Sequence, residues 1–221
     1  MKYLISFNES KKDKKYYTNI FINSYKDPKI QEMIPANMIN WDFHDKNGHD
    51  IGMIAVINNS YTMLGIFFDN VKKVSDITNA NAFASYLINA MYKNNLESVK
   101  LIIKNIDKFN ILYSNTVLHD LEESLTSCLR FAGQRSNIEA FDLLLNYPLW
   151  EECGIETSAN PNNWWVIYWT TKSANREMYS HLMKNVLKLD FIPNRKKVIA
   201  VCDDDKNRWK DISTDKLKEL K

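Results

Sequence analysis

The chain has 221 residues, 45% of them hydrophobic and 25% charged, and its formal net charge at pH 7 is +2. This length suits one domain or two small ones, and it allows a hydrophobic core without disulfides or structural metals. A near-neutral chain argues against nucleic acid as a partner, and the absence of any run of roughly 18 apolar residues argues against a membrane span.

The first part of the chain predicts an irregular segment followed by half of a helical unit. Residues 1–21 begin with an apolar run too short for a signal-peptide core and continue with a lysine-rich stretch, so a solvated N-terminal segment is expected. Residues 25–34 are expected to form a helix, because Pro28 suits a first-turn position. The buried face of this helix is predicted to comprise Ile30, Met33 and Ile34.

Residues 44–50 read His-Asp-Lys-Asn-Gly-His-Asp, and their two His-Asp pairs raise the question of a metal site. Metal ligands of this kind need a shared helix face or further ligands from elsewhere, and the chain has no His-Glu-x-x-His motif and no Cys/His cluster. The Asn-Gly dipeptide instead favours a tight turn, because glycine accepts a positive φ without steric cost. Asp45 is then expected to accept hydrogen bonds from backbone amides, and Asp50 to cap the helix that begins near Ile51.

Four pairs of amphipathic helices are predicted from residue 51 onward. Each pair consists of a helix with a small residue near its end, a polar turn, and a second helix with apolar residues at i, i+3 and i+4. Small residues let two helices approach closely, so each pair indicates a helical hairpin. The turns centre on residues 60, 95, 137 and 175, at spacings of 35, 42 and 38. The small residues are Ala55, Ala90, Ala132 and Thr170, and the second helices bury Leu64, Phe67 and Phe68; Val99, Ile102 and Ile103; Phe141, Leu144 and Leu145; and Tyr179, Leu182 and Met183.

The segment from Asp45 to Phe68 resembles an ankyrin repeat, a unit of about 33 residues formed by a β-turn and two antiparallel helices. The resemblance covers roughly residues 22–190. It rests on Asp45 and Gly48 at the turn positions, Ala55 at the small inner-helix position, Ser85 and Ser127 where the family prefers threonine, and Leu87 and Leu129 at the leucine two residues later.

Several positions depart from the ankyrin pattern. Asp50 and Trp165 replace the threonine that begins the first helix, and Gly52 replaces the leucine. The spacings between turns also exceed the family period of about 33 residues. A generic solenoid of helical hairpins is therefore the alternative fold.

The resemblance implies an all-α solenoid of about four to five stacked helical hairpins, forming a single domain over residues 1–221. Residues 22–190 would hold the divergent ankyrin-like repeats, between an irregular N-terminal segment at 1–21 and a C-terminal cap or tail at 191–221. Within the C-terminal segment, the apolar run 198–201 predicts either a short strand or a plug over the last repeat.

In ankyrin-like proteins the hairpin tips and inner helices form the usual contact surface, so the resemblance implies a non-enzymatic protein-binding module. Trp164 and Trp165 are adjacent and cannot both face one core, which favours a partner contact for one of them. The residues expected to contact the partner are Trp41, His44, Asp45, Lys46, Tyr113, Trp150 and Trp164.

The composition, rich in lysine, asparagine and isoleucine, is similar to that of proteins from AT-rich phages and large viruses. A phage- or virus-encoded inhibitor of a host defence protein, acting in the host cytoplasm, is the expectation that follows. Self-association through an uncapped end of the solenoid stays open beside it.

The alternative function is a metal-dependent hydrolase or a nucleic-acid-processing factor built on the loop at 44–50. The chain contains no phosphate-binding loop and no Gly-x-Ser-x-Gly motif, so neither an enzymatic activity nor a cofactor or metal is expected. The three cysteines form no Cys-x-x-Cys pair, which predicts reduced thiols in a cytoplasmic protein. The alternative site would comprise His44, Asp45, His49 and Asp50, and the cysteines are Cys128, Cys153 and Cys202.

Overall fold

Helices form all the regular structure that the computed structural model describes. It describes residues 14–74, 82–109, 115–146, 162–204 and 211–221, except for the side chains of 115–124. Within these ranges there is no strand, and the extended pairings are two isolated bridges, His44 with Asp50 and Asn163 with Asp211. The all-α prediction is confirmed for this part of the chain.

The chain divides into two compact units, residues 1–78 and 79–221. The single domain expected over residues 1–221 stays a prediction. None of the described helices combines the length and the apolar composition needed to cross a membrane.

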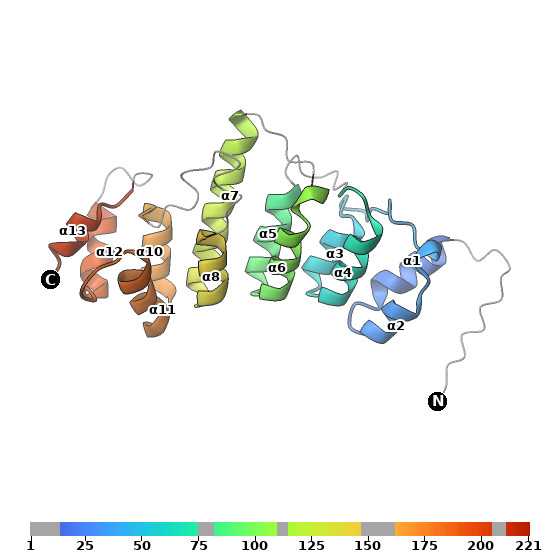
Figure 1. The fold of residues 1–221 in the computed structure, drawn as a ribbon, viewed down its shortest axis with the longest axis horizontal. Coiled ribbons are helices and arrows are strands. Elements are labelled where there is room, and N and C mark those ends of the chain that lie inside the picture. The colour runs from blue at the N-terminus through green and yellow to red at the C-terminus, as the bar shows by residue number, and fades with distance from the viewer. Residues whose placement is uncertain (1–13, 75–81, 110–114, 147–161, 205–210) are drawn as a thin grey trace. The chain divides into compact units, whose positions relative to one another are not determined.

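The first helix of the first unit begins earlier than the sequence predicts. The segment 1–21 was expected to be irregular, but a helix covers its end because Tyr17 and Phe21, four residues apart, are both buried. The Thr18 hydroxyl donates to the Lys14 carbonyl at 2.7 Å and accepts the Asn40 N–H at 2.8 Å, which ties this helix to the loop that follows. The elements are α1 (Lys14–Asn23), α2 (Pro28–Met33), the 3-10 helix η1 (Ala36–Met38), α3 (Ile51–Ile57) and α4 (Tyr61–Asn70) (Figure 1).

Pro28 lies in the first turn of α2, as predicted, but of the three residues predicted for its buried face only Ile34 is buried. The Asp27 side chain caps the helix by accepting the Ile30 N–H at 3.3 Å. Met33 is 53% exposed, whereas Gln31 and Ile34 are buried. The helix is only six residues long, so an apolar pattern over so few positions determines its orientation poorly.

In its described residues, the second unit shows three further helical hairpins and two C-terminal helices. Its elements are α5 (Ala82–Tyr92), α6 (Leu96–Lys104), the 3-10 helix η2 (Ile106–Lys108), α7 (Asn115–Gln134), α8 (Ile138–Leu145), α10 (Trp164–Ser173), α11 (Arg176–His181), the π-helical turn η3 (Leu182–Val186), α12 (Arg195–Asp204) and α13 (Thr214–Lys218).

The hairpins α3–α4, α5–α6 and α7–α8 end their first helix in the same way. In each, a residue with positive φ follows the helix: Asn59 at 59°, Asn94 at 56° and Ser136 at 57°. The next N–H then donates to the carbonyl of the fully buried alanine five residues earlier, at 2.8 to 3.0 Å, as in a Schellman motif. These alanines are the predicted small residues, Ala55, Ala90 and Ala132.

The residue after each turn caps the second helix. Ser60 accepts the Met63 N–H at 3.4 Å, and Asn95, Asn137 and Asn175 accept the N–H three residues on at 3.0, 3.0 and 2.8 Å. The hairpin α10–α11 keeps this cap although no positive φ precedes it. The four predicted hairpins are therefore confirmed. Each turn follows the end of the first helix, and its last residue caps the second helix.

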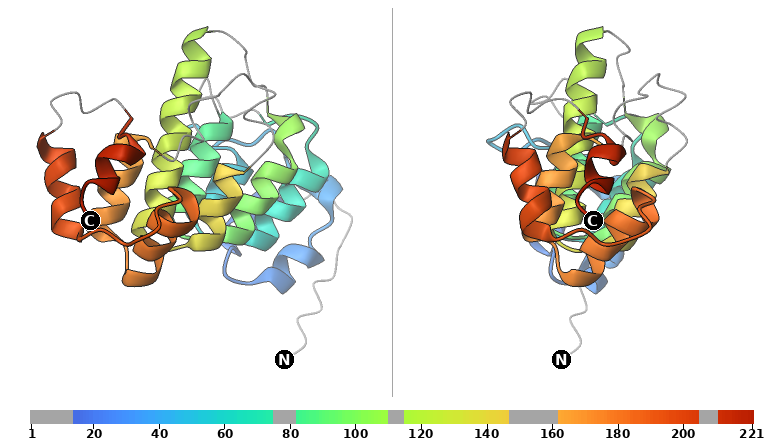
Figure 2. Two further views of the ribbon diagram at one scale, coloured as in Figure 1. Left: turned by 60° about the vertical axis from the view of Figure 1, so that its left-hand side comes forward. Right: turned by 90° about the vertical axis from the view of Figure 1, so that its left-hand side faces the viewer.

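Neighbouring hairpins of the second unit are joined at equivalent positions. The amide of Asn137 donates to the Asn94 side chain at 2.9 Å, and the Asn175 N–H donates to the Ser136 hydroxyl at 2.9 Å. The first helices α5, α7 and α10 contact one another in this order, and α6 contacts α8. Figures 1 and 2 show α7 extending at its N-terminal end beyond the ends of α5 and α10.

Residues 198–201 belong to the helix α12, which overturns the predicted strand, and α12 contacts α10 of the last hairpin. Val198 and Cys202 are both buried and lie four residues apart, which is the spacing of one helix face. Asn194 accepts the Lys196 N–H at 2.9 Å and so begins the helix directly after Pro193. Four apolar residues in a row do not by themselves distinguish a strand from a helix.

Candidate functional site

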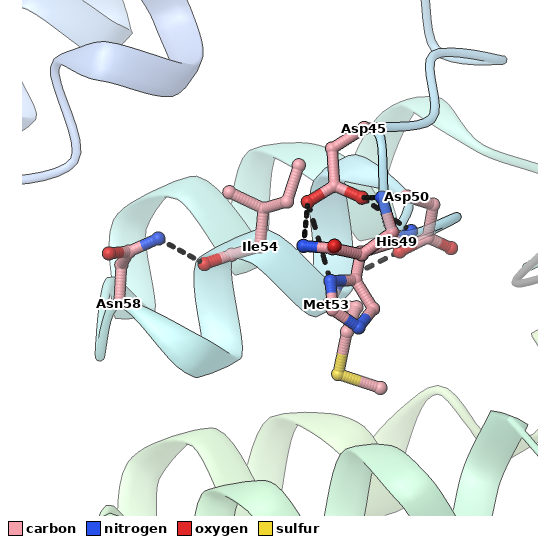
Figure 3. Close-up of polar contacts among 7 residues, drawn as sticks. Asp45, His49, Asp50, Met53, Ile54 and Asn58 are labelled. Atoms are coloured by element: carbon pink, nitrogen blue, oxygen red, sulfur yellow. Dashed lines mark hydrogen bonds and ion pairs between the residues drawn. The ribbon is translucent and has the colours of Figure 1, made fainter. Parts of the chain in front are cut away.

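The loop at residues 44–50 folds as the predicted turn. The Asp45 carboxylate accepts the N–H of Asn47 at 2.8 Å and of His49 at 2.9 Å, and Gly48 has a φ of 80°. Figure 3 shows the Asp45 carboxylate close to the His49 imidazole, where Oδ2 and Nδ1 are 3.4 Å apart. Burial raises the pKa of Asp45, but the two backbone N–H donors and the His49 imidazole outweigh it, and the pKa lies below its ordinary value. Asp45 therefore acts as an ionised centre that holds the turn.

The second aspartate of the loop caps α3, as predicted. Asp50 is 1% exposed, and its Oδ1 accepts the Met53 N–H at 2.7 Å. This bond satisfies one of the N–H groups that have no partner at the start of a helix.

We expect Asp50→Ala to lower the free energy of unfolding by about 1–2 kcal/mol, because the N-cap is lost. Asp50→Ser retains a capping oxygen and is expected to recover most of that loss. The measurement is urea denaturation followed by circular dichroism, with Asp69→Ala, an exposed carboxylate of α4, as the control. Equal midpoints for Asp50→Ala and Asp69→Ala would show that the cap contributes nothing.

The geometry of the loop gives no support to the metal-site interpretation. The Asp45 and Asp50 carboxylates are both engaged by backbone N–H groups. Across the ranges that the structure describes, no group of three or more His, Cys, Asp or Glu side chains is placed to hold a metal ion. The arrangement of these carboxylates is that of a structural turn.

A shallow cleft of about 310 Å³ lies between this loop and helices α1 and α3. Asp45 and His49 line it together with the amide side chains of Asn19, Asn23 and Asn58. The Asn58 amide is occupied, since it donates to the Ile54 carbonyl at 2.9 Å (Figure 3). The cleft carries no concentrated charge.

The other nominated residues of the first unit differ in accessibility. Lys46 is exposed and His44 is half-buried. Trp41 is half-buried, its Nε1 donates to the Ala36 carbonyl at 3.1 Å, and its ring lies 5.8 Å from that of Phe21. Most of the Trp41 ring therefore fills the core beside α1.

Trp164 was nominated as a contact residue, but its side chain belongs to the core of the second unit. It is 4% exposed, and its Nε1 donates to the Cys202 carbonyl at 2.8 Å, which joins α10 to α12. The neighbouring Trp165 is half-buried, so the two rings do not share one core, as predicted. The two remaining nominations, Tyr113 and Trp150, lie outside the described side chains.

A surface that the sequence analysis did not single out lies on the first helices of the second unit. Its aromatic rings are half-buried or exposed, and its cations lie against them. We call it the cation–aromatic face. It comprises Tyr92 from α5, Arg130, Phe131 and Arg135 from α7 and its turn, and Trp165, Tyr168, Trp169 and Lys172 from α10.

Arg130 is the centre of the cation–aromatic face. Its guanidinium carbon lies 4.6 Å from the ring centroid of Phe131, 5.4 Å from that of Trp165 and 5.9 Å from that of Trp169. Burial lowers the pKa of Arg130, and its Nε has no hydrogen-bond partner in the described structure. This cation is partly desolvated and held by ring faces.

The two outer cations repeat this arrangement. Arg135 lies over Tyr92 at 5.5 Å, and Lys172 lies over Tyr168 at 5.1 Å and over Trp169 at 5.2 Å. Both cations are exposed, and Tyr92 is 53% exposed. The face is therefore accessible at both ends.

The stretches of the first helices that form the face contain no acidic residues. Residues 82–92, 125–134 and 164–173 contain no aspartate or glutamate. The acidic residue of α7 closest in sequence to Arg130 is Glu123, about 10 Å away along the helix axis. Among the described side chains, the ion pairs of this unit lie on other elements, as between Lys100 and Glu139 at 2.7 Å.

Comparisons with protein-family models, with curated proteins and with solved structures found no match for this chain.

Proposed function

We propose that the protein is a non-enzymatic protein-binding module, a divergent ankyrin-like solenoid that binds its partner through the cation–aromatic face. The observation that carries this proposal is the row of half-buried aromatic rings and cations on α5, α7 and α10. Tryptophan, tyrosine and arginine are the residues most enriched at binding hot spots, because each contributes a large contact area or several hydrogen bonds.

The repeated hairpin turns support the ankyrin-like part of the proposal. Three turns share one hydrogen-bond pattern, and the turns of adjacent hairpins in the second unit are bonded to each other. In ankyrin-like proteins the inner helices belong to the contact surface, and α5, α7 and α10 are the first helices of their hairpins. A phage- or virus-encoded inhibitor of a host protein is the role that the composition favours within this proposal.

Tyr92→Ala is expected to weaken partner binding at least about fivefold, because an exposed hot-spot ring is lost while the core stays intact. The matched control is Tyr61→Ala, which removes a tyrosine of similar exposure, 47%, from α4 in the first unit. Partners are captured from host lysate on the full chain and identified by mass spectrometry. Each purified partner is then titrated against the parent chain, Tyr92→Ala and Tyr61→Ala, and the three dissociation constants are compared.

The result that contradicts the proposal is a purified partner that binds Tyr92→Ala as tightly as the parent chain. A loss of binding in Tyr61→Ala alone would move the contact surface to the first unit. Circular dichroism of each variant verifies that the helical content is unchanged.

A further inference from the structure

The rings of the cation–aromatic face are covered by cations. Arg130 lies over Trp165 and Trp169, and the second cation over Trp169 is Lys172, at 5.2 Å. The rings also meet one another edge to face: Trp165 with Trp169 at 77° and Tyr168 with Trp169 at 80°. The groups presented outward are therefore guanidinium and ammonium groups with aromatic support behind them.

A cation held in this way is prepared for a carboxylate. The guanidinium of Arg130 has already lost part of its hydration to the surrounding rings, as its buried Nε indicates. Its planar fork matches a carboxylate with two parallel hydrogen bonds, and the aromatic support limits the conformational freedom lost on binding. In the described part of the chain, no carboxylate pairs with Arg130, Arg135 or Lys172.

The spacing of the cations fits an extended peptide. Arg130 and Arg135 are separated by about 7.5 Å along the α7 direction, since a helix rises 1.5 Å per residue. Lys172 lies on α10, and packed helices are about 8–10 Å apart. In an extended chain, side chains on one face repeat about every 7 Å. Acidic residues at alternate positions would therefore have a spacing close to the axial offset between Arg130 and Arg135.

We propose, as a refinement that rests on the function proposed above, that the cation–aromatic face binds an acidic, extended segment of the partner protein. Its carboxylates pair with Arg130, Arg135 and Lys172, and its apolar side chains pack on the exposed ring of Tyr92.

Single-stranded nucleic acid is the competing ligand for a surface of arginines and aromatic rings. It binds such surfaces by stacking bases on open ring faces. Here Arg130 lies over both Trp165 and Trp169. The whole chain also has a net charge of only +2. Both observations favour carboxylates over phosphates with stacked bases.

The test uses the full chain and three fluorescein-labelled probes of about twelve units: a peptide of alternating glutamate and alanine, the same peptide with glutamine for glutamate, and oligothymidylate. Binding is followed by fluorescence anisotropy at low salt. We expect the glutamate peptide to bind and the glutamine peptide to bind at least about tenfold more weakly. Added salt is expected to lower the affinity for the glutamate peptide.

The double variant Arg135→Gln/Lys172→Gln removes two exposed cations of the face. We expect it to bind the glutamate peptide about fivefold or more weakly than the parent chain does. The matched control is Lys104→Gln with Lys184→Gln, which removes the same charge from exposed positions on α6 and η3. For this control we expect the affinity for the glutamate peptide to change less than twofold.

The acidic-segment proposal is overturned by equal binding of the glutamate and glutamine peptides, by equal weakening in the two double variants, by binding of oligothymidylate alone, or by a glutamate peptide that does not bind. If the glutamate peptide fails but a captured partner still loses affinity for Tyr92→Ala, the protein-binding function stands and only the acidic segment is wrong. If the peptide fails and the purified partner also binds Tyr92→Ala unchanged, both proposals are wrong.

Discussion

Replacing Trp164 with alanine is expected to lower the free energy of unfolding of the second unit by about 3–5 kcal/mol, the usual cost of deleting a buried tryptophan. The side chain is 4% exposed and stacks on Tyr168 with ring centroids 4.9 Å apart. Its removal leaves a cavity between α10 and α12 that the surrounding side chains can fill only in part.

A second part of the cost comes from the Cys202 carbonyl. It belongs to the last turn of α12, where carbonyls lack an intrahelical N–H partner, and the indole Nε1–H of Trp164 donates to it at 2.8 Å. Trp164→Phe keeps most of the ring volume but loses this donor. We expect a loss of about 1–3 kcal/mol for Trp164→Phe, the cost of leaving a buried carbonyl unpaired.

Trp165→Ala is the matched control, because it removes the same side chain from the adjacent, half-buried position. We expect Trp165→Ala to lower the free energy of unfolding less than Trp164→Ala does. The proposed function also predicts that Trp165→Ala lowers the affinity for the partner more. Urea denaturation followed by far-UV circular dichroism measures the first quantity without relying on tryptophan fluorescence. If Trp164→Ala proves no more destabilising than Trp165→Ala, the burial of Trp164 is wrong.

The hairpins could be predicted from the sequence because each is specified by residues close together in the chain. The small residue, the turn and the helix cap of one hairpin lie within six positions of each other, as Ala55, Asn59 and Ser60 illustrate. Local hydrogen bonds determine such a turn, so its chemistry is visible in the residue types. The same applies to the loop at 44–50, where Asp45 and Gly48 determine the turn.

The cation–aromatic face could not be predicted in the same way, because its residues come from three helices. Tyr92, Arg130 and Trp165 are far apart in the sequence and meet only when α5, α7 and α10 pack. The distinction between Trp164 and Trp165 depends on α12, a helix that the sequence analysis did not predict. The one available signal was compositional: three tryptophans and one lysine without acidic residues along α10.

Adding a β-carbon to Gly133 is expected to destabilise the second unit, although alanine normally favours a helix over glycine. Gly133 lies on α7 against α10, and an added Cβ would overlap the Thr170 hydroxyl oxygen and lie 3.0 Å from both its Cβ and its Cγ2. Rotation of the Thr170 side chain can move its hydroxyl, but its Cβ is fixed to the α10 backbone and stays 3.0 Å from the added carbon. Overpacking of this kind costs about 1–3 kcal/mol, against a gain in helix propensity of about 1 kcal/mol.

We therefore expect Gly133→Ala to lose up to about 2 kcal/mol of unfolding free energy and Gly133→Val to lose more. Gly65→Ala, at a half-exposed position inside α4, is the control and should be neutral or stabilising. Thr170→Ala removes the overlapping hydroxyl, which has no hydrogen-bond partner in the described structure, and should recover part of the loss in the double variant. If Gly133→Ala instead stabilises the chain as Gly65→Ala does, α7 and α10 are not in close contact, and the cation–aromatic face that depends on their packing would not form.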